Sequence, residues 1–125
     1  MIVADSDVLI DALRGREPSL SRIRDELGAG SLVTTAVTVF ELRSGAGTDQ
    51  ARHAVETLLA PLTMLPLDAA AARAAADIRL VLEQIGQKIG MADYLIAGIC
   101  LSTGASLLTR NREHFERVPG LLLEV

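Results

Sequence analysis

The chain has 125 residues and a mass of 13.3 kDa, a length that suits one domain and excludes a two-domain enzyme. Hydrophobic residues make up 50% of the chain and charged residues 22%, which excludes disorder because there is ample material for a core. The net charge of −4 excludes the general basic surface of a nonspecific DNA binder, although a nuclease needs only a local basic patch.

No segment is expected to cross a membrane or to form a disulfide. The longest apolar stretch, residues 94–101, is well short of the ~18 residues that span a bilayer, and Asp5 and Asp7 interrupt any signal sequence. Cys100 is the only cysteine, which excludes an internal disulfide and a thiolate metal site. We therefore expect one soluble, cytoplasmic domain over residues 1–125.

Short strand-like runs alternate with helical segments along the chain. In chain order, the pattern predicts a strand at residues 1–4, helices at 6–13 and 19–27, a strand at 32–35, helices at 38–44 and 49–59, a strand at 64–65, helices at 68–85 and 91–102, and strands at 106–109 and 121–124. Thr38 and Asp68 are expected to cap the helices that follow them. The alternation predicts an α/β fold, a three-layer α/β/α sandwich around a mostly parallel sheet of about five strands.

Polar residues follow several of these strands, where the reactive groups of a parallel sheet gather. Asp5 follows the first strand, Thr38 and Glu41 follow the second, and Thr109 and Asn111 follow the fourth. A structural role remains open for some of them, since Asp5 suits a helix cap and Asn111 suits a turn.

A third acid, Asp93, lies at the start of the apolar helix at 91–102, where it would also complement the helix dipole. Carboxylates that converge in a cleft repel one another, by ~4 kcal/mol per pair at 4 Å and an effective dielectric of 20, so a cluster requires a compensating cation. Hard oxygen ligands select Mg²⁺ or Mn²⁺.

Four ordered segments resemble the motifs of the PIN-domain family and together cover the chain from end to end. They read VADSDVLID, TTAVTVFEL, MADYLIAGIC and LLTRNREHFERVPGL. The short length points within that family to the VapC-type toxins of prokaryotic toxin–antitoxin pairs. The fourth motif often carries Asp where this chain has Asn111, a neutral ligand, so the resemblance leaves one or two metal ions open.

The resemblance implies a metal-dependent endoribonuclease that an antitoxin inhibits. In it, Asp5 and Asp93 would hold Mg²⁺ or Mn²⁺, and Glu41 would steady the ion. Thr109 and Asn111 would orient water or ligands, and no histidine is needed as a general base. The remaining roles are supporting ones for Thr38 and for Asp7, which would cap backbone N–H groups or touch the outer shell of the site, while His53 and His114 are expected outside the cluster.

Partners are expected as well. Eleven of the twelve basic residues are arginine, and those expected to contact RNA phosphates are Arg14, Arg16, Arg43, Arg110 and Arg112. The high apolar content predicts exposed apolar helix surface, and thus a homodimer and a groove for an amphipathic antitoxin segment, with the helices at 19–27 and 49–59 as candidates for the groove.

Two other functions remain open. Asp5 and Asp7 resemble the nucleophile and general acid of haloacid-dehalogenase-like phosphatases, but that family's later lysine and acid pair are missing. Alternatively, the chain is a PIN-fold binding protein with weakened catalysis, which Asn111 and the acidic balance favour and the three retained carboxylates oppose.

Overall fold

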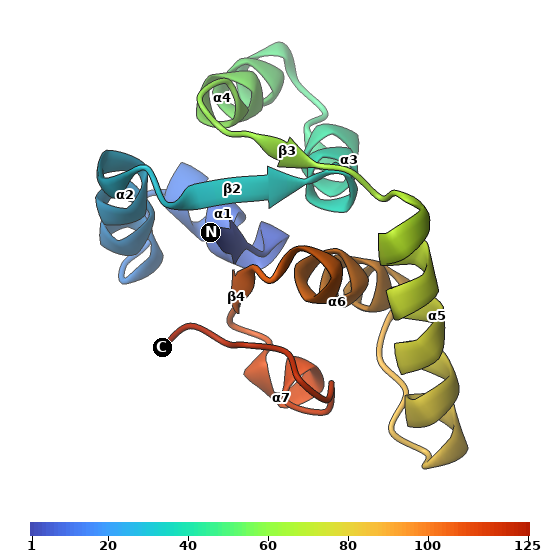
Figure 1. The fold of residues 1–125 in the computed structure, drawn as a ribbon. Helices are drawn as coiled ribbons and strands as arrows, with labels where there is room; N and C mark the ends of the chain where they lie inside the picture. Colours follow the sequence, from blue (N-terminus) through green and yellow to red (C-terminus); the bar gives the residue numbers. More distant parts are fainter.

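A computed structural model describes residues 1–125. Its sheet has four parallel strands in the order β3-β2-β1-β4 (Figure 1). The bounds are β1 Ile2–Ala4, β2 Leu32–Thr35, β3 Met64–Leu65 and β4 Ser106–Leu108. From β1 the chain proceeds to β2 and β3 on one side and returns to β4 on the other. The strand order therefore reverses at β1, and a cleft is expected beyond the carboxyl ends of β1 and β4.

Seven helices cover the sheet. They are α1 Ser6–Leu13, α2 Ser19–Ala29, α3 Ala36–Gly45, α4 Asp49–Leu59, α5 Ala69–Gln84, α6 Met91–Thr103 and α7 Arg112–Phe115. One buried cluster joins one face of the sheet to α1, α2 and α4, and a second joins the other face to α5, α6 and α7. These are the three layers that the alternating pattern predicts, and the α/β/α fold is confirmed.

Three details of the predicted helices are wrong. The second helix continues through Gly28 to Ala29, and α7 was not predicted. The helix predicted at 38–44 begins at Ala36, with Thr35 as its N-cap, because the Thr35 hydroxyl accepts the Thr38 N–H at 3.0 Å. Asp68 does cap α5, where its carboxylate accepts the Ala71 N–H at 2.9 Å.

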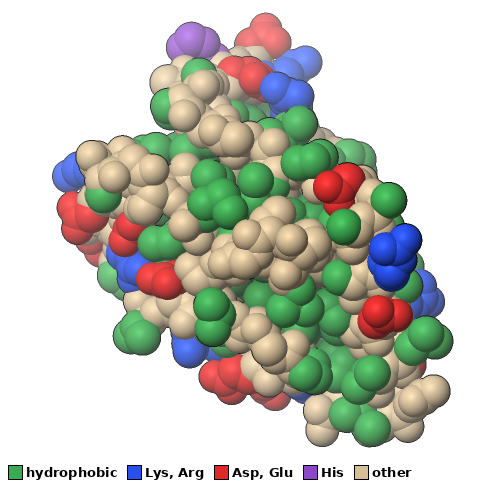
Figure 2. Space-filling view, viewed as in Figure 1, with side chains coloured by type: hydrophobic (Ala, Val, Ile, Leu, Met, Phe, Trp, Pro, Cys, Tyr) green, Lys and Arg blue, Asp and Glu red, His purple; other side chains and the backbone are tan.

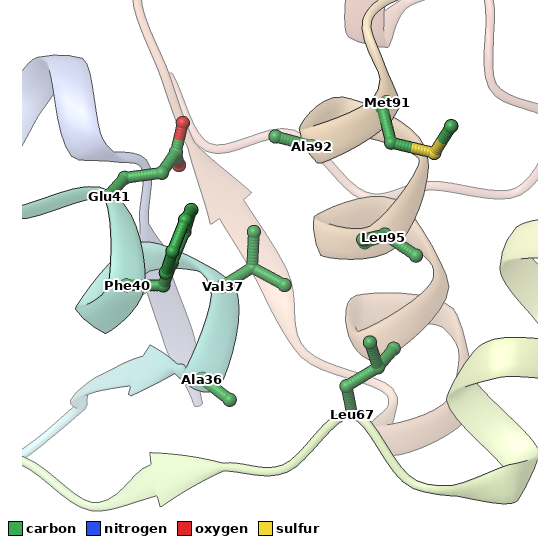
Figure 3. Close-up of a pocket in the computed structure, with 8 residues that line it drawn as sticks. All are labelled: Ala36, Val37, Phe40, Glu41, Leu67, Met91, Ala92 and Leu95. Atoms are coloured by element: carbon green, nitrogen blue, oxygen red, sulfur yellow. The ribbon is translucent and has the colours of Figure 1, made fainter. Parts of the chain in front are cut away.

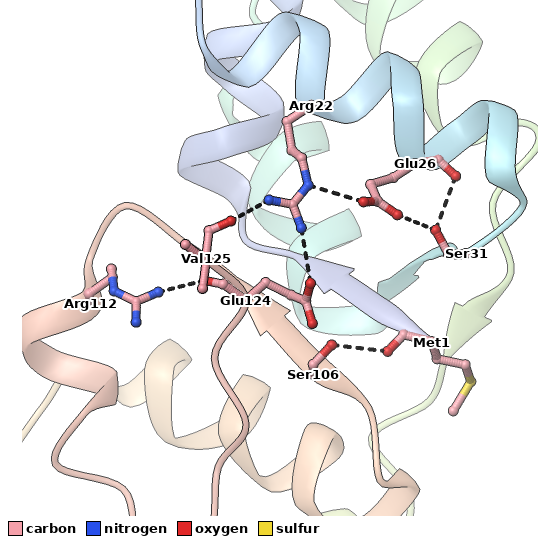
Figure 4. Close-up of polar contacts among 8 residues, drawn as sticks. All are labelled: Met1, Arg22, Glu26, Ser31, Ser106, Arg112, Glu124 and Val125. Atoms are coloured by element: carbon pink, nitrogen blue, oxygen red, sulfur yellow. Dashed lines mark hydrogen bonds and ion pairs between the residues drawn. The ribbon is translucent and has the colours of Figure 1, made fainter.

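The predicted fifth strand is reduced to a single parallel bridge between Leu107 and Leu123. Side chains hold this tail in place of a longer ladder (Figure 4). The Arg22 guanidinium donates to the Val125 carbonyl and, at 2.9 Å, to Glu124, while Arg112 donates to the Glu124 carbonyl at 2.5 Å. These contacts hold the tail beside β4, and the sheet has four strands.

The α5 and α6 helices approach each other closely at Gly98. A Cβ at this position would lie 2.6 Å from the Ala71 carbonyl oxygen and 2.7 Å from the Ala75 Cβ. The alanine-rich sequence of α5 matches this approach, since small side chains allow two helix backbones to come together. No helix of the chain is both long and apolar enough to span a bilayer.

Candidate active site

Asp5 lies at the carboxyl end of β1, beside β4, where the strand order reverses. Its backbone N–H donates to the Leu108 carbonyl at 2.8 Å, which ties it to the neighbouring strand. One carboxylate oxygen accepts the Ser6 N–H at 2.8 Å, and the other accepts the Thr109 hydroxyl at 2.7 Å. Asp5 therefore caps α1 and lies in the predicted site at the same time.

Burial and neighbouring acids make the Asp5 carboxyl hard to ionise. Only 6% of the residue is exposed. Burial, followed by the charge of Asp7 and more weakly that of Asp93, raises the pKa of Asp5 to about 6, while the hydrogen bonds from Thr109 and Ser6 oppose the rise. The acids at this edge of the sheet therefore act on one another electrostatically, as the sequence predicts.

Glu41, on α3, is exposed to the negative charge of the same acids. Burial raises the pKa of Glu41, and the charges of Asp93 and Asp7 raise it further, although the Ser6 side chain opposes them. Its Oε1 atom is buried and has no hydrogen-bond partner. An unpartnered buried carboxylate oxygen is costly, so this atom is available to bind a cation or to accept a hydrogen bond from a ligand.

Thr38 is buried one turn before Glu41 on α3. Its hydroxyl lies 3.0 Å from the Thr35 hydroxyl, and its N–H also bonds Thr35. The structure therefore places Thr38 in the first turn of α3, where it helps to fix the helix that carries Glu41.

Asp7 is held by two backbone amides. One carboxylate oxygen accepts the Val8 N–H at 2.6 Å, and the other accepts the Arg110 N–H at 3.1 Å. Burial is the main cause that raises the pKa of Asp7. Because both oxygens are used in joining α1 to the segment after β4, Asp7 is poorly placed to be the general acid that the phosphatase alternative requires.

Asp93, Asn111 and His114 form the third side of the site. Asp93 is in the first turn of α6, with its side chain 21% exposed. The Asn111 N–H donates to the Thr109 hydroxyl at 3.0 Å, and its Nδ2 lies 2.9 Å from His114 Nδ1, which is 3.6 Å from Asp93 Oδ2. The expectation that His114 lies outside the cluster is wrong, because α7 places residues 111 and 114 on one side of a helical turn.

Comparison with known proteins assigns the family. The PIN-domain family model matches residues 2–121. The chain belongs to the PIN-domain family. It is 33% identical over 124 residues to a tRNA(fMet)-specific endonuclease VapC of Shigella flexneri, an alignment that covers 96% of this chain and 93% of that protein. It is 35% identical over 115 residues to Ribonuclease VapC10 of Mycobacterium tuberculosis, covering 92% and 86%.

A solved structure supports the same assignment. The crystal structure of VapBC2 from Rickettsia felis, bound to a DNA fragment from its promoter, matches with a TM-score of 0.88 and 26% identity over 99% of this chain and 98% of that one. The resemblance of the four motifs to PIN-domain proteins of the VapC type is therefore confirmed, and the haloacid-dehalogenase alternative is not supported.

Most of the predicted phosphate-binding arginines of this PIN domain are engaged in ion pairs. Arg43 contacts both Glu56 oxygens, at 2.7 and 3.0 Å. Arg110 lies 2.7 Å from Asp11. The other engaged side chains are Arg16, 3.9 Å from Asp11, and Arg112, 3.8 Å from Glu116. Arg14 has no ion pair, and it lines the same hollow as Glu41.

The oxygen ligands in the candidate site of this PIN domain suit a hard divalent cation. The side chains with free acceptors are carboxylates and an amide, all oxygen donors, and their mutual repulsion calls for positive charge. No three His, Cys, Asp or Glu side chains lie close enough together to hold a metal ion by themselves. The buried, unpartnered Oε1 of Glu41 is the observation that supports a ligand at this point.

Proposed function

We propose that the chain is a metal-dependent endoribonuclease, the toxin of a toxin–antitoxin pair, which hydrolyses RNA phosphodiester bonds in the cytoplasm. The observation that carries the proposal is the group formed by Asp5, Glu41 and Asp93 at the reversal of strand order, in a chain whose PIN-domain relatives are named as ribonucleases.

In the proposed mechanism, Asp5 and Asp93 would hold the ion and Glu41 would steady it. When bound, Mg²⁺ or Mn²⁺ supplies a Lewis acid that activates water and neutralises charge on the phosphate. Thr109 holds the Asp5 carboxylate through its hydroxyl, and Asp7 fixes the start of α1 against the segment after β4. These contacts keep the acids in place before RNA arrives.

Arg14 is the proposed phosphate contact. Its partner-free guanidinium and Glu41 line one hollow of about 280 Å³ between α1, α3 and α4. A cation there would hold the RNA backbone beside the acids, which otherwise repel it. The other arginines would first have to leave their carboxylate partners.

The antitoxin site is proposed between α1, α2 and α4. A hollow of about 240 Å³ there is lined by apolar side chains that include Leu20, Leu27 and Leu58. It shares Leu13 with the hollow that contains Glu41, so the two hollows are neighbours. We propose that an amphipathic segment fills the apolar hollow and places an arginine against Glu41. This fits the toxin–antitoxin assignment of the VapBC family, to which solved neighbours of this chain belong.

A homodimer is proposed through a second apolar surface, which borders Glu41. Phe40, Leu67 and Met91 are 69%, 40% and 57% exposed, and they line a hollow of about 500 Å³ between α3 and α6 (Figure 3). Figure 2 shows hydrophobic side chains near the middle of the face viewed there, with most charged side chains toward its edge. A dimer would remove such apolar surface from water.

Light scattering of the wild type and of Phe40→Ser tests the proposed dimer. A monomeric wild type contradicts this proposal.

An RNA cleavage assay tests the function. The wild type should cut RNA with Mg²⁺ or Mn²⁺, stop in EDTA and recover when the metal is restored. Asp5→Asn and Asp93→Asn should each lose several orders of magnitude, whereas Asp77→Asn, a change at an exposed position on α5, should be fully active. Cleavage that persists in EDTA contradicts the metal, and RNA binding without cleavage under every condition supports the binding-protein alternative instead.

A further inference from the structure

The amide of Asn111 has two unlike ends, and the structure shows which of them is engaged. An amide NH₂ group only donates hydrogen bonds, whereas its oxygen only accepts them. Asn111 Nδ2 lies 2.9 Å from His114 Nδ1. Because the NH₂ group can only donate, Nδ1 is the acceptor of this hydrogen bond.

His114 is better placed to act on Asn111 than on Asp93. Its Nδ1 is 3.6 Å from Asp93 Oδ2, beyond hydrogen-bond distance. The ring is carried by α7, which the buried Phe115 anchors in the core. At the other end of the contact, the Asn111 N–H is fixed on the Thr109 hydroxyl at 3.0 Å, and that hydroxyl donates to Asp5. Asn111 is therefore held at both its backbone and its NH₂ group.

We propose that His114 is a positioning residue that takes up the NH₂ group of Asn111 and so leaves the amide oxygen as its free end. In a cluster of acids that attracts cations, an oxygen is a useful neutral ligand, whereas an exposed NH₂ would oppose the cation. Without the ring, the two ends of the amide could exchange by a simple rotation. This role rests on the proposed metal-dependent function and specifies how a neutral residue serves in it.

A double-mutant cycle tests the role, because a carboxylate needs no such orientation. His114→Ala should slow RNA cleavage about tenfold in the wild-type background, in line with residues that orient metal ligands. In the Asn111→Asp background, the same change should cost less than about twofold, since both carboxylate oxygens are acceptors. An equal loss in both backgrounds overturns the proposal, because His114 would then act independently of residue 111.

Conservative replacement separates positioning from packing. His114→Gln offers a carbonyl oxygen that can accept the same hydrogen bond and should recover most of the activity, whereas His114→Leu fills space without an acceptor and should not. His53→Ala, at an exposed position on α4, is the matched control and should have no effect. Equal activity of the Gln and Leu variants would contradict the role.

A spectroscopic measurement on the metal-free protein is independent of catalysis. The side-chain NH₂ signals of Asn111 in a ¹⁵N-correlated NMR spectrum should shift in His114→Leu and stay close to the wild-type position in His114→Gln. The ring nitrogens of His114 should show hydrogen on Nε2. If the chain cleaves no RNA, the proposed function is wrong, but the hydrogen bond between His114 and Asn111 can still be measured. If the NH₂ signals of Asn111 do not change when His114 is replaced, only the positioning role is wrong.

Discussion

Replacing Asp5 by Asn is expected to stabilise the metal-free chain at neutral pH, although it removes a residue of the site. The folded state raises the pKa of Asp5 from 3.8 to about 6. The native carboxyl therefore binds its proton more tightly than the unfolded one. It follows that ionised Asp5 destabilises the fold above about pH 6, and that this cost disappears as the pH falls through 6 toward 4.

The size of the effect follows from the shift. About two pKa units correspond to ~3 kcal/mol in the free energy of unfolding. The amide cannot accept both hydrogen bonds that Thr109 and Ser6 give to the carboxylate, and each loss costs ~1 kcal/mol. We therefore expect a net gain of ~1–2 kcal/mol, or roughly 5 °C in melting temperature, at about pH 7.5.

Thermal unfolding in EDTA, followed by circular dichroism, measures this gain. The melting temperature of Asp5→Asn should exceed that of the wild type at about pH 7.5 and should fall level with it or below it at about pH 4. Excess Mn²⁺ should raise the melting temperature of the wild type but not that of Asp5→Asn. Asp25→Asn, at an exposed position on α2, should match the wild type throughout. The reasoning would be refuted if Asp5→Asn were less stable than the wild type at neutral pH. It would also be refuted if the difference in melting temperature between the two proteins did not change with pH.

Three further changes have distinct expected results. Gly98→Ala should lower the free energy of unfolding by ~1–3 kcal/mol in urea titrations because its Cβ meets backbone atoms, whereas Gly28→Ala, in open space on α2, should raise it by ~0.5–1 kcal/mol; equal effects would contradict the close packing of α5 on α6. Asp7→Asn should slow RNA cleavage only about tenfold in single-turnover assays, and a complete loss would place Asp7 in the chemistry. Arg14→Ala should weaken RNA binding in fluorescence titrations and lower its salt dependence, whereas Arg43→Ala should leave both unchanged; the reverse order would assign the phosphate contact to Arg43.

The layers of the fold could be predicted because their signals are local. Asp68 followed by an alanine run indicates a capped helix, and alternating strands and helices favour a parallel sheet. The prediction of a fifth strand was wrong because strand formation depends on residues far away in the sequence. The apolar residues 121–123 suit a strand, but a strand needs a continuous ladder, and only Leu123 forms a bridge while Arg22 and Arg112 hold the tail.

Asp5 and Glu41 were predictable as candidates because they follow strands, whereas Asp93 was a candidate through its place at the start of α6. Asp5 and Thr109 meet because β1 and β4 are parallel neighbours, a pairing that the sequence suggests only through its alternation. The contact between Asp7 and the Arg110 N–H joins residues 103 positions apart, and no local pattern reports it. His114 was missed because α7 has four residues, too few for a periodic signal, although its spacing of three from Asn111 is the one available hint.

The most direct test of the central claim is to sequence the 5′ ends of RNA fragments after brief induction of the chain in cells. The account predicts new 5′ ends at discrete internal positions of RNA in cells that express the wild type. It also predicts that these ends are absent with Asp93→Asn, expressed at the same level. New ends that appear equally with both proteins, or no new ends with the wild type, would contradict the claim that this PIN domain is an endoribonuclease whose acids carry the reaction.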